Sequence, residues 1–363
     1  MKKILFYLSG HGFGHSTRMV EVMKQLTALK KDVHCIVKTT APKWLFDLSL
    51  DNPYEYFELK SDIGVIQKDS LNLDKLATLK GYAEFLQNKE TIIREESRFV
   101  KENRISAIVG DIPPIAFDIA REANIPGIAI SNFSWDWIYK DYVKELPEYE
   151  FLIQEIESSY SRAELLLRLP FYGDMSAFPK TKDISLIVRS SDLSEEEILG
   201  KAGLRNTLVE DKKIVLLSFG GFYHAEIDYS RLGELEEYLF LSFSPLQQNR
   251  AKNILVLPPR FIDHHHLVRI CDIVVSKPGY GIVAECIANK KPLLYTSRGD
   301  FAEYPVLSEG MKQYIPALFM PRDDFHSGKW GLYLNKILQS KEKKETMSLC
   351  GGQEASEAII SFL

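Results

Sequence analysis

The stretch KILFYLSGHGFGHSTR, residues 3–18, joins an apolar run to a loop with three glycines and two histidines. The apolar run Ile4–Leu8 predicts a buried strand, and Ser16–Leu29 places apolar residues at helical spacing. A strand, a glycine turn and a helix in this order expose backbone N–H groups at the carboxyl edge of a parallel sheet. The stretch therefore predicts the first unit of an α/β fold, with a ligand site at the turn.

The same alternation of apolar runs and helical periodicity continues along most of the chain. Further strands are expected at Val33–Val37, Ala107–Val109, Gly127–Ile130, Leu165–Leu169, Ile214–Phe219, Ile254–Leu257, Ile273–Val275, Leu293–Tyr295 and Ile315–Met320. These runs are continuously apolar, as a parallel sheet covered on both faces requires. A chain of 363 residues is longer than one core usually serves. We therefore expect an α/β fold of two doubly wound parallel-sheet domains.

The pattern lapses over residues 170–197, which hold turn residues, prolines and mixed charges. We place the domain boundary near Lys182, so that residues 1–182 form the first domain and residues 183–350 the second. Residues 351–363 predict a packed terminal helix, which can dock on its own domain or cross back to the first.

Composition narrows the class of protein. Hydrophobic residues make up 45% of the chain, and 45 Lys and Arg face 50 Asp and Glu, for a net charge of −5. This balance argues against a broad nucleic-acid surface. The first apolar run is too short for a signal peptide or a membrane span, so we expect a cytoplasmic protein, with contact at a membrane surface left open. Four cysteines without paired spacing predict buried thiols and no zinc site.

The glycine loop does not match a dinucleotide fingerprint, because His15 stands where the third glycine belongs and Asp32 precedes the second strand. His11 and His15 are four residues apart, which on a helix would make a metal pair, but the glycines between them disfavour a helix. We therefore expect neither a nicotinamide cofactor nor a metal. A turn with locally bonded histidines is the plain alternative.

His15 is expected in the first helical turn at the crest of the sheet, where the helix dipole favours a neutral imidazole that can accept a proton. Asp111 ends the strand ISAIVGD, and neighbouring parallel strands end at the same edge. It is thus placed to hold the second nitrogen of His15. A helix cap is an equally good reading of Asp111.

The second domain carries a similar strand, turn and helix in SKPGYGIVAE, residues 276–285. A lysine beside a glycine turn at a helix N-terminus suits a diphosphate. Glu285, one turn into the helix, can accept two ribose hydroxyls, although a helical carboxylate is more often a solvated one. Gly220 and Gly221 form another glycine pair at the same sheet edge. After Asp263, the three adjacent histidines His264, His265 and His266 cannot converge on one ion, since successive helical residues point about 100° apart, and we expect them to start a helix.

These residues resemble a family. The motifs GFGH, GYGIVAE and KKPLLYTSRGDFAEYP look like those of GT-B fold nucleotide-sugar glycosyltransferases, which have two Rossmann-like domains facing a cleft. Seven motifs in order resemble, more closely, the glycosyltransferase-like N-terminal region of plant L-arabinokinases. They are GHGFGHSTR, ISNFSWDWIYKDY, GDMSAFP, LIVRSSDLSEEEI, FGGF, LPPRF and SKPGYGIVAE. No kinase phosphate loop occurs in the sequence, so kinase activity is not expected.

The resemblance assigns roles to individual residues. His15 becomes the catalytic base and Asp111 its partner. Donor-binding residues become Gly220, Gly221, Lys277, Gly279, Tyr280, Gly281, Glu285 and either Asp300 or Glu303. Acceptor-side residues become Gly12, Gly14, Phe133 and Trp135, although these two aromatic residues equally suit packing between the domains. Ile282 and Val283 replace the usual hydroxyl residues after the donor glycine, so main-chain N–H groups must make that phosphate contact.

The sequence thus predicts a metal-independent, inverting glycosyltransferase that needs no cofactor. It would move a sugar from a nucleoside-diphosphate sugar, with UDP as the expected nucleotide, to an acceptor hydroxyl. A non-catalytic nucleotide-sugar-binding module and a nucleotide-sugar epimerase on the same fold are the alternatives.

Overall fold

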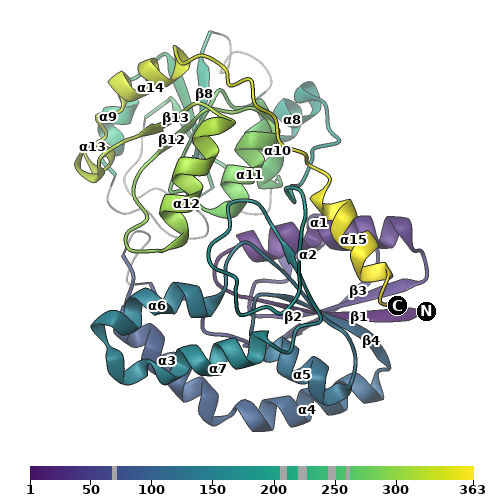
Figure 1. Ribbon diagram of the computed structural model, residues 1–363. Helices are drawn as coiled ribbons and strands as arrows, with labels where there is room; N and C mark the ends of the chain where they lie inside the picture. The colour runs from purple at the N-terminus through teal and green to yellow at the C-terminus, as the bar shows by residue number, and fades with distance from the viewer. Residues whose placement is uncertain (68–71, 205–210, 220–226, 244–250, 259–261) are drawn as a thin grey trace.

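The computed structural model describes residues 1–67, 72–204, 211–219, 227–243, 251–258 and 262–363. It contains a seven-stranded and a six-stranded sheet, each flanked by helices (Figure 1). Every strand pair within both sheets is parallel. The expected α/β fold of two Rossmann-like, doubly wound domains is confirmed.

The first sheet has the strand order β3-β2-β1-β4-β5-β6-β7. Its strands are β1 Lys2–Leu8, β2 Val33–Thr39, β3 Tyr54–Glu58, β4 Ile105–Asp111, β5 Gly127–Ser131, β6 Leu165–Arg168 and β7 Thr181–Asp183. The chain direction across the sheet reverses between β1 and β4, which are neighbours. Ligands of open α/β sheets bind at the carboxyl edge of such a switch point.

The helices of the first domain cover both faces of this sheet. They are α1 Gly14–Leu29, α2 Trp44–Asp47, α3 Lys75–Gln87, α4 Lys89–Glu102, α5 Ile115–Ala123, α6 Trp135–Glu145, η1 Pro147–Tyr149 and α7 Phe151–Tyr160. Helices α3, α4, α5 and α7 lie on one side of the sheet and α1 on the other (Figure 1). The apolar face of α1 is fully buried, with Met19, Val22 and Leu26 at 0% exposure. Because this side of α1 is buried, its residues are apolar at regular helical spacing in the sequence.

The second sheet repeats the first arrangement in the order β10-β9-β8-β11-β12-β13. Its strands are β8 Lys213–Ser218, β9 Tyr238–Ser242, β10 Ile254–Val256, β11 Ile273–Ser276, β12 Leu293–Tyr295 and β13 Ala317–Phe319. Its helices are α8 Glu195–Lys201, α9 Tyr229–Gly233, α10 His264–Ile270, α11 Tyr280–Ala288, α12 Glu303–Gly310, η2 Met311–Gln313, α13 Arg322–His326 and α14 Gly331–Leu338. The switch point here lies between β8 and β11, so α11 starts at the edge where a ligand is expected.

The connection between the sheets begins after β7. This strand pairs with β6, so Lys182 lies inside the last strand of the first sheet. The terminal helix α15, Gly351–Ile360, crosses back to the first domain and lies beside α1 (Figure 1). There the Ser356 hydroxyl donates to the Val22 carbonyl at 3.1 Å. Both domains are thus tied together at a point far from their facing sheet edges.

Three strands were not expected from the sequence: β3, β7 and β9. The strands β3 and β7 lie next to or at a sheet edge and carry charged residues, so they lack the continuous apolar pattern of the inner strands. The run Tyr238–Ser242 is short and completely buried, and such a run cannot be told from a piece of buried helix by periodicity.

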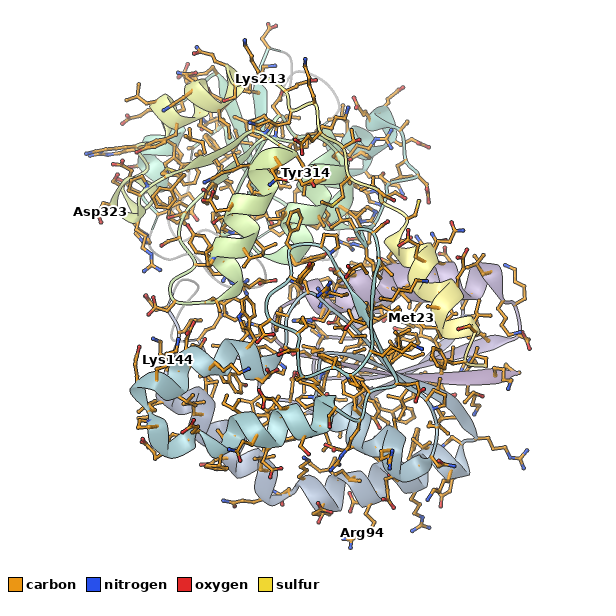
Figure 2. The ribbon with its side chains drawn as sticks, viewed as in Figure 1. Met23, Arg94, Lys144, Lys213, Tyr314 and Asp323 are labelled. Carbon is orange, nitrogen blue, oxygen red and sulfur yellow. The ribbon has the colours of Figure 1, made fainter. Side chains whose placement is uncertain are left out.

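Charged side chains such as Arg94, Lys144 and Lys213 point outward, whereas Met23 on α1 is enclosed (Figure 2). Among the described residues, no helix is both long enough and apolar enough to cross a bilayer. Three cysteines are buried, as expected, but Cys350 is exposed. The expectation of four buried thiols was wrong at Cys350 because this residue immediately precedes α15, at the outer end of the helix.

Candidate functional site

The loop after β1 is shaped by its glycines. Gly12 has a φ of +77°, in the left-handed region that side chains with a Cβ rarely adopt. Helix α1 begins two residues later at Gly14, so His15 stands in its first turn. This placement brings the imidazole to the carboxyl edge of the first sheet, at the switch point between β1 and β4.

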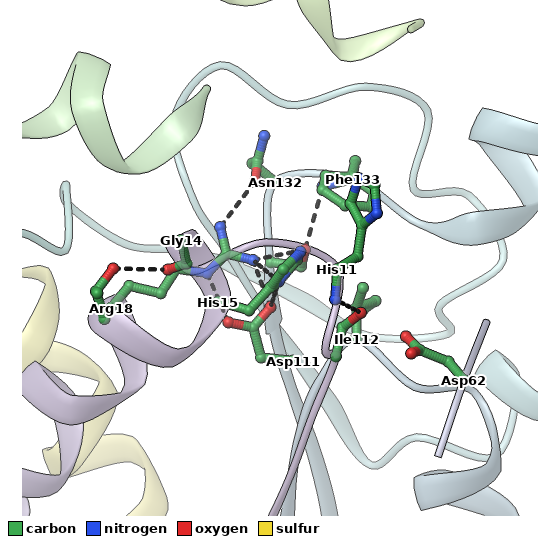
Figure 3. Close-up of polar contacts among 12 residues, drawn as sticks. His11, Gly14, His15, Arg18, Asp62, Asp111, Ile112, Asn132 and Phe133 are labelled. Atoms are coloured by element: carbon green, nitrogen blue, oxygen red, sulfur yellow. Dashed lines mark hydrogen bonds and ion pairs between the residues drawn. The ribbon is translucent and has the colours of Figure 1, made fainter. Parts of the chain in front are cut away.

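His15 and Asp111 are in direct contact (Figure 3). Their hydrogen bond joins His15 Nδ1 to Asp111 Oδ1 at 2.8 Å, and the residues are only 6% and 0% exposed. Because an ionised carboxylate can only accept, Nδ1 carries the hydrogen of a neutral His15 and donates it. Nε2 then keeps its lone pair, which is the state that a general base needs.

Arg18 completes this cluster. Its Nε donates to Asp111 Oδ2 at 2.6 Å, and its Nη2 also bonds Asp111 Oδ1. Burial alone would raise the pKa of Asp111, but the charge of Arg18 and the hydrogen bonds from Arg18 and His15 outweigh it and lower that pKa. Asp111 therefore remains ionised at neutral pH and holds the side chains of Arg18 and His15 in place.

A chain of hydrogen bonds leads from this cluster into the second domain. Arg18 Nη1 donates to Asn132 Oδ1 at 2.9 Å, and Asn132 Nδ2 donates to Glu303 Oε1 at 2.7 Å. Arg298 Nη1 donates to the other oxygen of Glu303 at 2.8 Å. Of the two acidic candidates for the donor sugar, Glu303 thus faces the His15 cluster. Asp300 is exposed and forms an ion pair with Lys75 at 3.3 Å.

The N-terminus of α11 meets that of α1 across the domain interface. A Cβ on Gly281 would lie 3.5 Å from Gly14 Cα, and one on Gly279 would lie 3.9 Å from Arg298 Nη1. Tyr280 is buried, and the Arg18 guanidinium lies 5.1 Å from its ring centre. The positive ends of two helices therefore meet here, beside the ion pairs of Arg18 with Asp111 and Arg298 with Glu303, and a helix N-terminus favours an anion.

His11 lies next to this positive region. Burial lowers its pKa well below 6.5, and the charges of Arg298, His15 and Lys277 lower it further. Its Nδ1 accepts the Val65 N–H at 3.2 Å, and its ring stacks on Phe301 at 5.8 Å. His11 is therefore neutral at pH 7. Lys277 lies between the end of β11 and the N-terminus of α11.

Glu285 is buried one turn into α11, away from open solvent. Its Oε1 accepts from Arg189 Nη2 at 2.7 Å, and its Oε2 contacts His264 Nδ1 at 2.9 Å. Burial would raise the pKa of Glu285, but Arg189 and His264 bring it down to about 2. The carboxylate is thus ionised, and it has lone pairs beyond those two bonds with which to accept ribose hydroxyls.

The three adjacent histidines point to three partners, as their helical spacing requires. His264 contacts Glu285, His265 Nδ1 lies 3.3 Å from Asp263 Oδ1, and His266 contacts Ser191 at 2.7 Å. Within the part of the chain that the structure describes, no group of three or more His, Cys, Asp or Glu side chains is arranged to hold a metal ion.

The two acceptor-side aromatic residues are enclosed. Phe133 is 3% exposed and packs edge-on against His15, with ring centres 5.6 Å apart. Trp135 is 0% exposed, and its Nε1 donates to Asp62 Oδ2 at 2.9 Å. Phe133 also packs against Phe301 of the second domain, with ring centres 5.9 Å apart. Gly220 and Gly221 lie outside the described residues.

Sequence reasoning missed Arg18, Asn132, Arg298 and Asp62. A signal existed for Arg18, because residues three apart share a helix face and His15 was already a candidate. A signal existed for Asn132 too, which follows β5 as directly as Asp111 ends β4. Arg298 and Asp62 lie in irregular loops, where no periodicity indicates which way a side chain points.

Comparison with known proteins supports the family resemblance. Residues 2–170 match the model of the family described as glycosyl transferase family 1. The chain is 32% identical to the L-arabinokinase of Arabidopsis thaliana over 98% of its own length. It spans about a third of that relative, 34% of its length.

Solved structures similar to this chain share its fold across both domains. One is the glycosyltransferase of kitacinnamycin, with a TM-score of 0.66 at 14% identity, covering 100% of this chain and 99% of that one. Another is MnaA of S. aureus with UDP, with a TM-score of 0.61 at 14% identity, covering 100% and 98%. A third is UGT89C1 of Arabidopsis thaliana with UDP, with a TM-score of 0.58 at 12% identity, covering 99% and 94%. The predicted GT-B fold is confirmed.

Proposed function

Because this GT-B chain matches glycosyl transferase family 1 over residues 2–170 and resembles structures solved with UDP, we propose that it transfers a sugar from a UDP-sugar to an acceptor hydroxyl. The observation that carries the proposal is the buried His15–Asp111 pair, at 2.8 Å, at the sheet edge that faces the N-terminus of α11. A base and an anion site then lie on opposite sides of one domain interface.

In the proposed reaction His15 Nε2 removes the proton of the acceptor hydroxyl as its oxygen attacks the anomeric carbon. A glycosidic bond forms, and the bond from the anomeric carbon to the diphosphate oxygen breaks with its electron pair going to UDP. Attack from the face opposite UDP inverts the anomeric centre. Asp111 holds the imidazole and stabilises the imidazolium that forms.

The leaving UDP gains negative charge, which the second domain is suited to stabilise without a metal ion. Lys277, just before α11, and the N–H groups at the start of α11 are proposed to supply this positive potential, with Arg298 beside Gly279. Glu285 is proposed to accept the ribose hydroxyls, and Glu303 those of the donor sugar. The hydrogen bond from Asn132 to Glu303 shows that Glu303 can accept a polar donor at the interface.

The test is turnover by the purified chain with a panel of UDP-sugars and hydroxyl acceptors, with product detected by mass spectrometry. Transfer that is lost in His15→Ala, while UDP still binds, supports the proposal. Three results would contradict it: transfer at the wild-type rate in His15→Ala, isomerised donor formed without acceptor, or UDP-sugar binding without any product. The last result would fit a binding module, in keeping with the similarity to one third of a longer L-arabinokinase.

A further inference from the structure

A cavity of about 380 Å³ opens beside the glycine loop, at the carboxyl edge of β1, β2 and β3. Its walls come from the connections that follow these three strands. Two glycines and two aliphatic residues line it, together with five polar side chains: His11, Thr40, Lys60, Asp62 and Gln67. The volume lies at the small end of the range for ligand pockets, so the occupant is a small molecule.

Asp62 is the carboxylate in this lining, and because it is buried it needs hydrogen-bond donors. It is 6% exposed, and its Oδ2 accepts from Trp135 Nε1 at 2.9 Å. Burial raises the pKa of Asp62, while hydrogen bonds from Ser9 and Trp135 act in the opposite direction. A carboxylate can accept about four hydrogen bonds, so two donors leave capacity for donors that enter from the cavity. In the view of Figure 3, Asp62 lies on the same side of Asp111 as His11.

A second group in the lining has no partner of its own. Gln67 Oε1 is buried and makes no hydrogen bond to any described residue. A buried carbonyl oxygen without a donor costs free energy comparable to a lost hydrogen bond. His11 adds a donor, because its Nδ1 accepts from Val65 and the hydrogen of the neutral ring is therefore on Nε2. The cavity thus offers the acceptors of Asp62 and Gln67 and the donor of His11, beside the Thr40 hydroxyl and the Lys60 ammonium that also line it.

We propose that this cavity is the acceptor subsite and that the acceptor is a small polyhydroxylated compound, a free sugar or a polyol. Hydroxyls of the acceptor donate to Asp62 and Gln67 and leave one further hydroxyl for His15. An apolar, flat acceptor would cover Asp62 and Gln67 without supplying donors, which is unfavourable for both groups. The inference rests on the proposed function, since it names the acceptor class of that same reaction.

Asp62 bonds Trp135 at 2.9 Å, Trp135 packs against Phe133 with ring centres 5.0 Å apart, and Phe133 packs against His15 with ring centres 5.6 Å apart. The cavity and the base are therefore neighbours. A molecule seated in the cavity therefore needs to extend only past the glycine loop to bring a hydroxyl to His15. Gly12 makes this approach open, because a Cβ placed on it would meet no atom within 4 Å.

The experiment uses saturation-transfer NMR and calorimetry on the whole chain, with myo-inositol and D-galactose as polyhydroxylated probes and 4-nitrophenol as a flat aromatic probe with a single hydroxyl. We expect one or both of the polyhydroxylated probes to bind the wild type. Asp62→Asn removes the charge of the first acceptor, and Gln67→Met removes the second acceptor. Each substitution should weaken that binding about tenfold. Glu342→Gln, in a separate cavity of about 220 Å³, is the matched control and should bind the probe like the wild type.

Binding of UDP is titrated in the same samples. If UDP does not bind but a polyhydroxylated probe does, the proposed function fails while the polar subsite stands. If UDP binds but neither polyhydroxylated probe does, or 4-nitrophenol alone binds, the acceptor class is overturned. Equal binding of the probes to the wild type and both cavity variants would also overturn it, provided that circular dichroism shows all proteins folded.

Discussion

His15 and Asp111 are 96 residues apart in sequence, yet their side chains share a buried hydrogen bond of 2.8 Å. The contact exists because β1 and β4 are neighbours in the first sheet, with Leu8 paired to Asp111. Helix α1 begins just beyond β1 and returns His15 to the end of β4. The proposed chemistry therefore depends on the pairing of β1 with β4, which brings the segments that follow these two strands together.

The first prediction concerns the base. His15→Ala should lower kcat by about 10²- to 10⁴-fold, the usual contribution of general base catalysis, and leave UDP affinity unchanged because we propose that UDP binds to the second domain. Initial rates and calorimetric titration with UDP measure the two effects. The control is His34→Ala, at a histidine that contacts Glu55 on β3 far from the site. A kcat within twofold of wild type in His15→Ala would refute the assignment.

The second prediction concerns Arg18, which is 4% exposed and bonded to a completely buried carboxylate. Arg18→Met leaves Asp111 as a buried charge without its cation, which should cost about 3–5 kcal/mol in the free energy of unfolding. Urea denaturation followed by circular dichroism measures it. Arg98→Met, at an exposed pair with Glu102, should leave the free energy of unfolding nearly unchanged, because solvent screens such a pair. Equal losses in the two variants would contradict the role given to Arg18.

The third prediction separates the two acidic candidates for the donor sugar. Glu303→Gln should weaken a UDP-sugar about tenfold, because a charge-assisted hydrogen bond is lost, but leave UDP binding nearly unchanged. Asp300→Asn is the control, since this exposed residue contacts Lys75 and should alter neither affinity. Competition titrations with UDP and UDP-sugar measure the difference. An equal loss for both ligands would place Glu303 on the nucleotide instead.

The fourth prediction concerns the diphosphate. Lys277→Ala should weaken UDP binding about tenfold or more, since a charged hydrogen bond to phosphate is lost, and the remaining affinity should depend less on salt. Lys213→Ala, at an exposed lysine paired with Asp272, is the control. Calorimetry at two ionic strengths tests both points. Unchanged UDP affinity in Lys277→Ala would remove the lysine from the site.

The fifth prediction concerns acid stability. The pKa of Glu285 falls from 4.5 in the unfolded chain to about 2 in the folded one. The folded state therefore binds fewer protons, and the stabilisation by Glu285 is present above pH 4.5 and lost as the pH falls toward 2. Glu285→Gln should be less stable than the wild type at pH 7, and it should lose less stability than the wild type between about pH 5 and about pH 2.5. Urea midpoints across this range measure the slope.

In that series Glu342→Gln, which alters an exposed glutamate, should keep the wild-type slope. Asp111 contributes acid dependence of the same sign, because its pKa is also lowered by folding. Glu285→Gln should therefore reduce the slope and leave part of it in place. A slope identical to that of the wild type would show that Arg189 and His264 do not hold the Glu285 charge.

Much of the candidate site was predictable from local pattern. His15 follows a strand and a glycine turn, and Asp111 ends a continuous apolar strand, so both fall at a sheet edge in any parallel arrangement. Lys277 and Gly279 follow β11 in the same way. Three-dimensional packing was needed for Arg298 and Asp62, because their loops have no periodicity that indicates side-chain direction. It was also needed to choose Glu303 rather than Asp300, because that choice depends on the conformation of one short loop.

By itself, the sequence determined the two doubly wound domains, the inner strands other than β9, and the sheet edges at which the candidate site residues lie. It did so because buried parallel strands and glycine turns can be recognised from the types and spacing of residues that are close in sequence. Only the tertiary structure decided that Arg18 binds Asp111, that Asn132 bonds Glu303 across the domains, and that GHGFGH borders a polar cavity. Those contacts join segments far apart in the chain, and side-chain direction across such distances is set by packing, which no local spacing encodes.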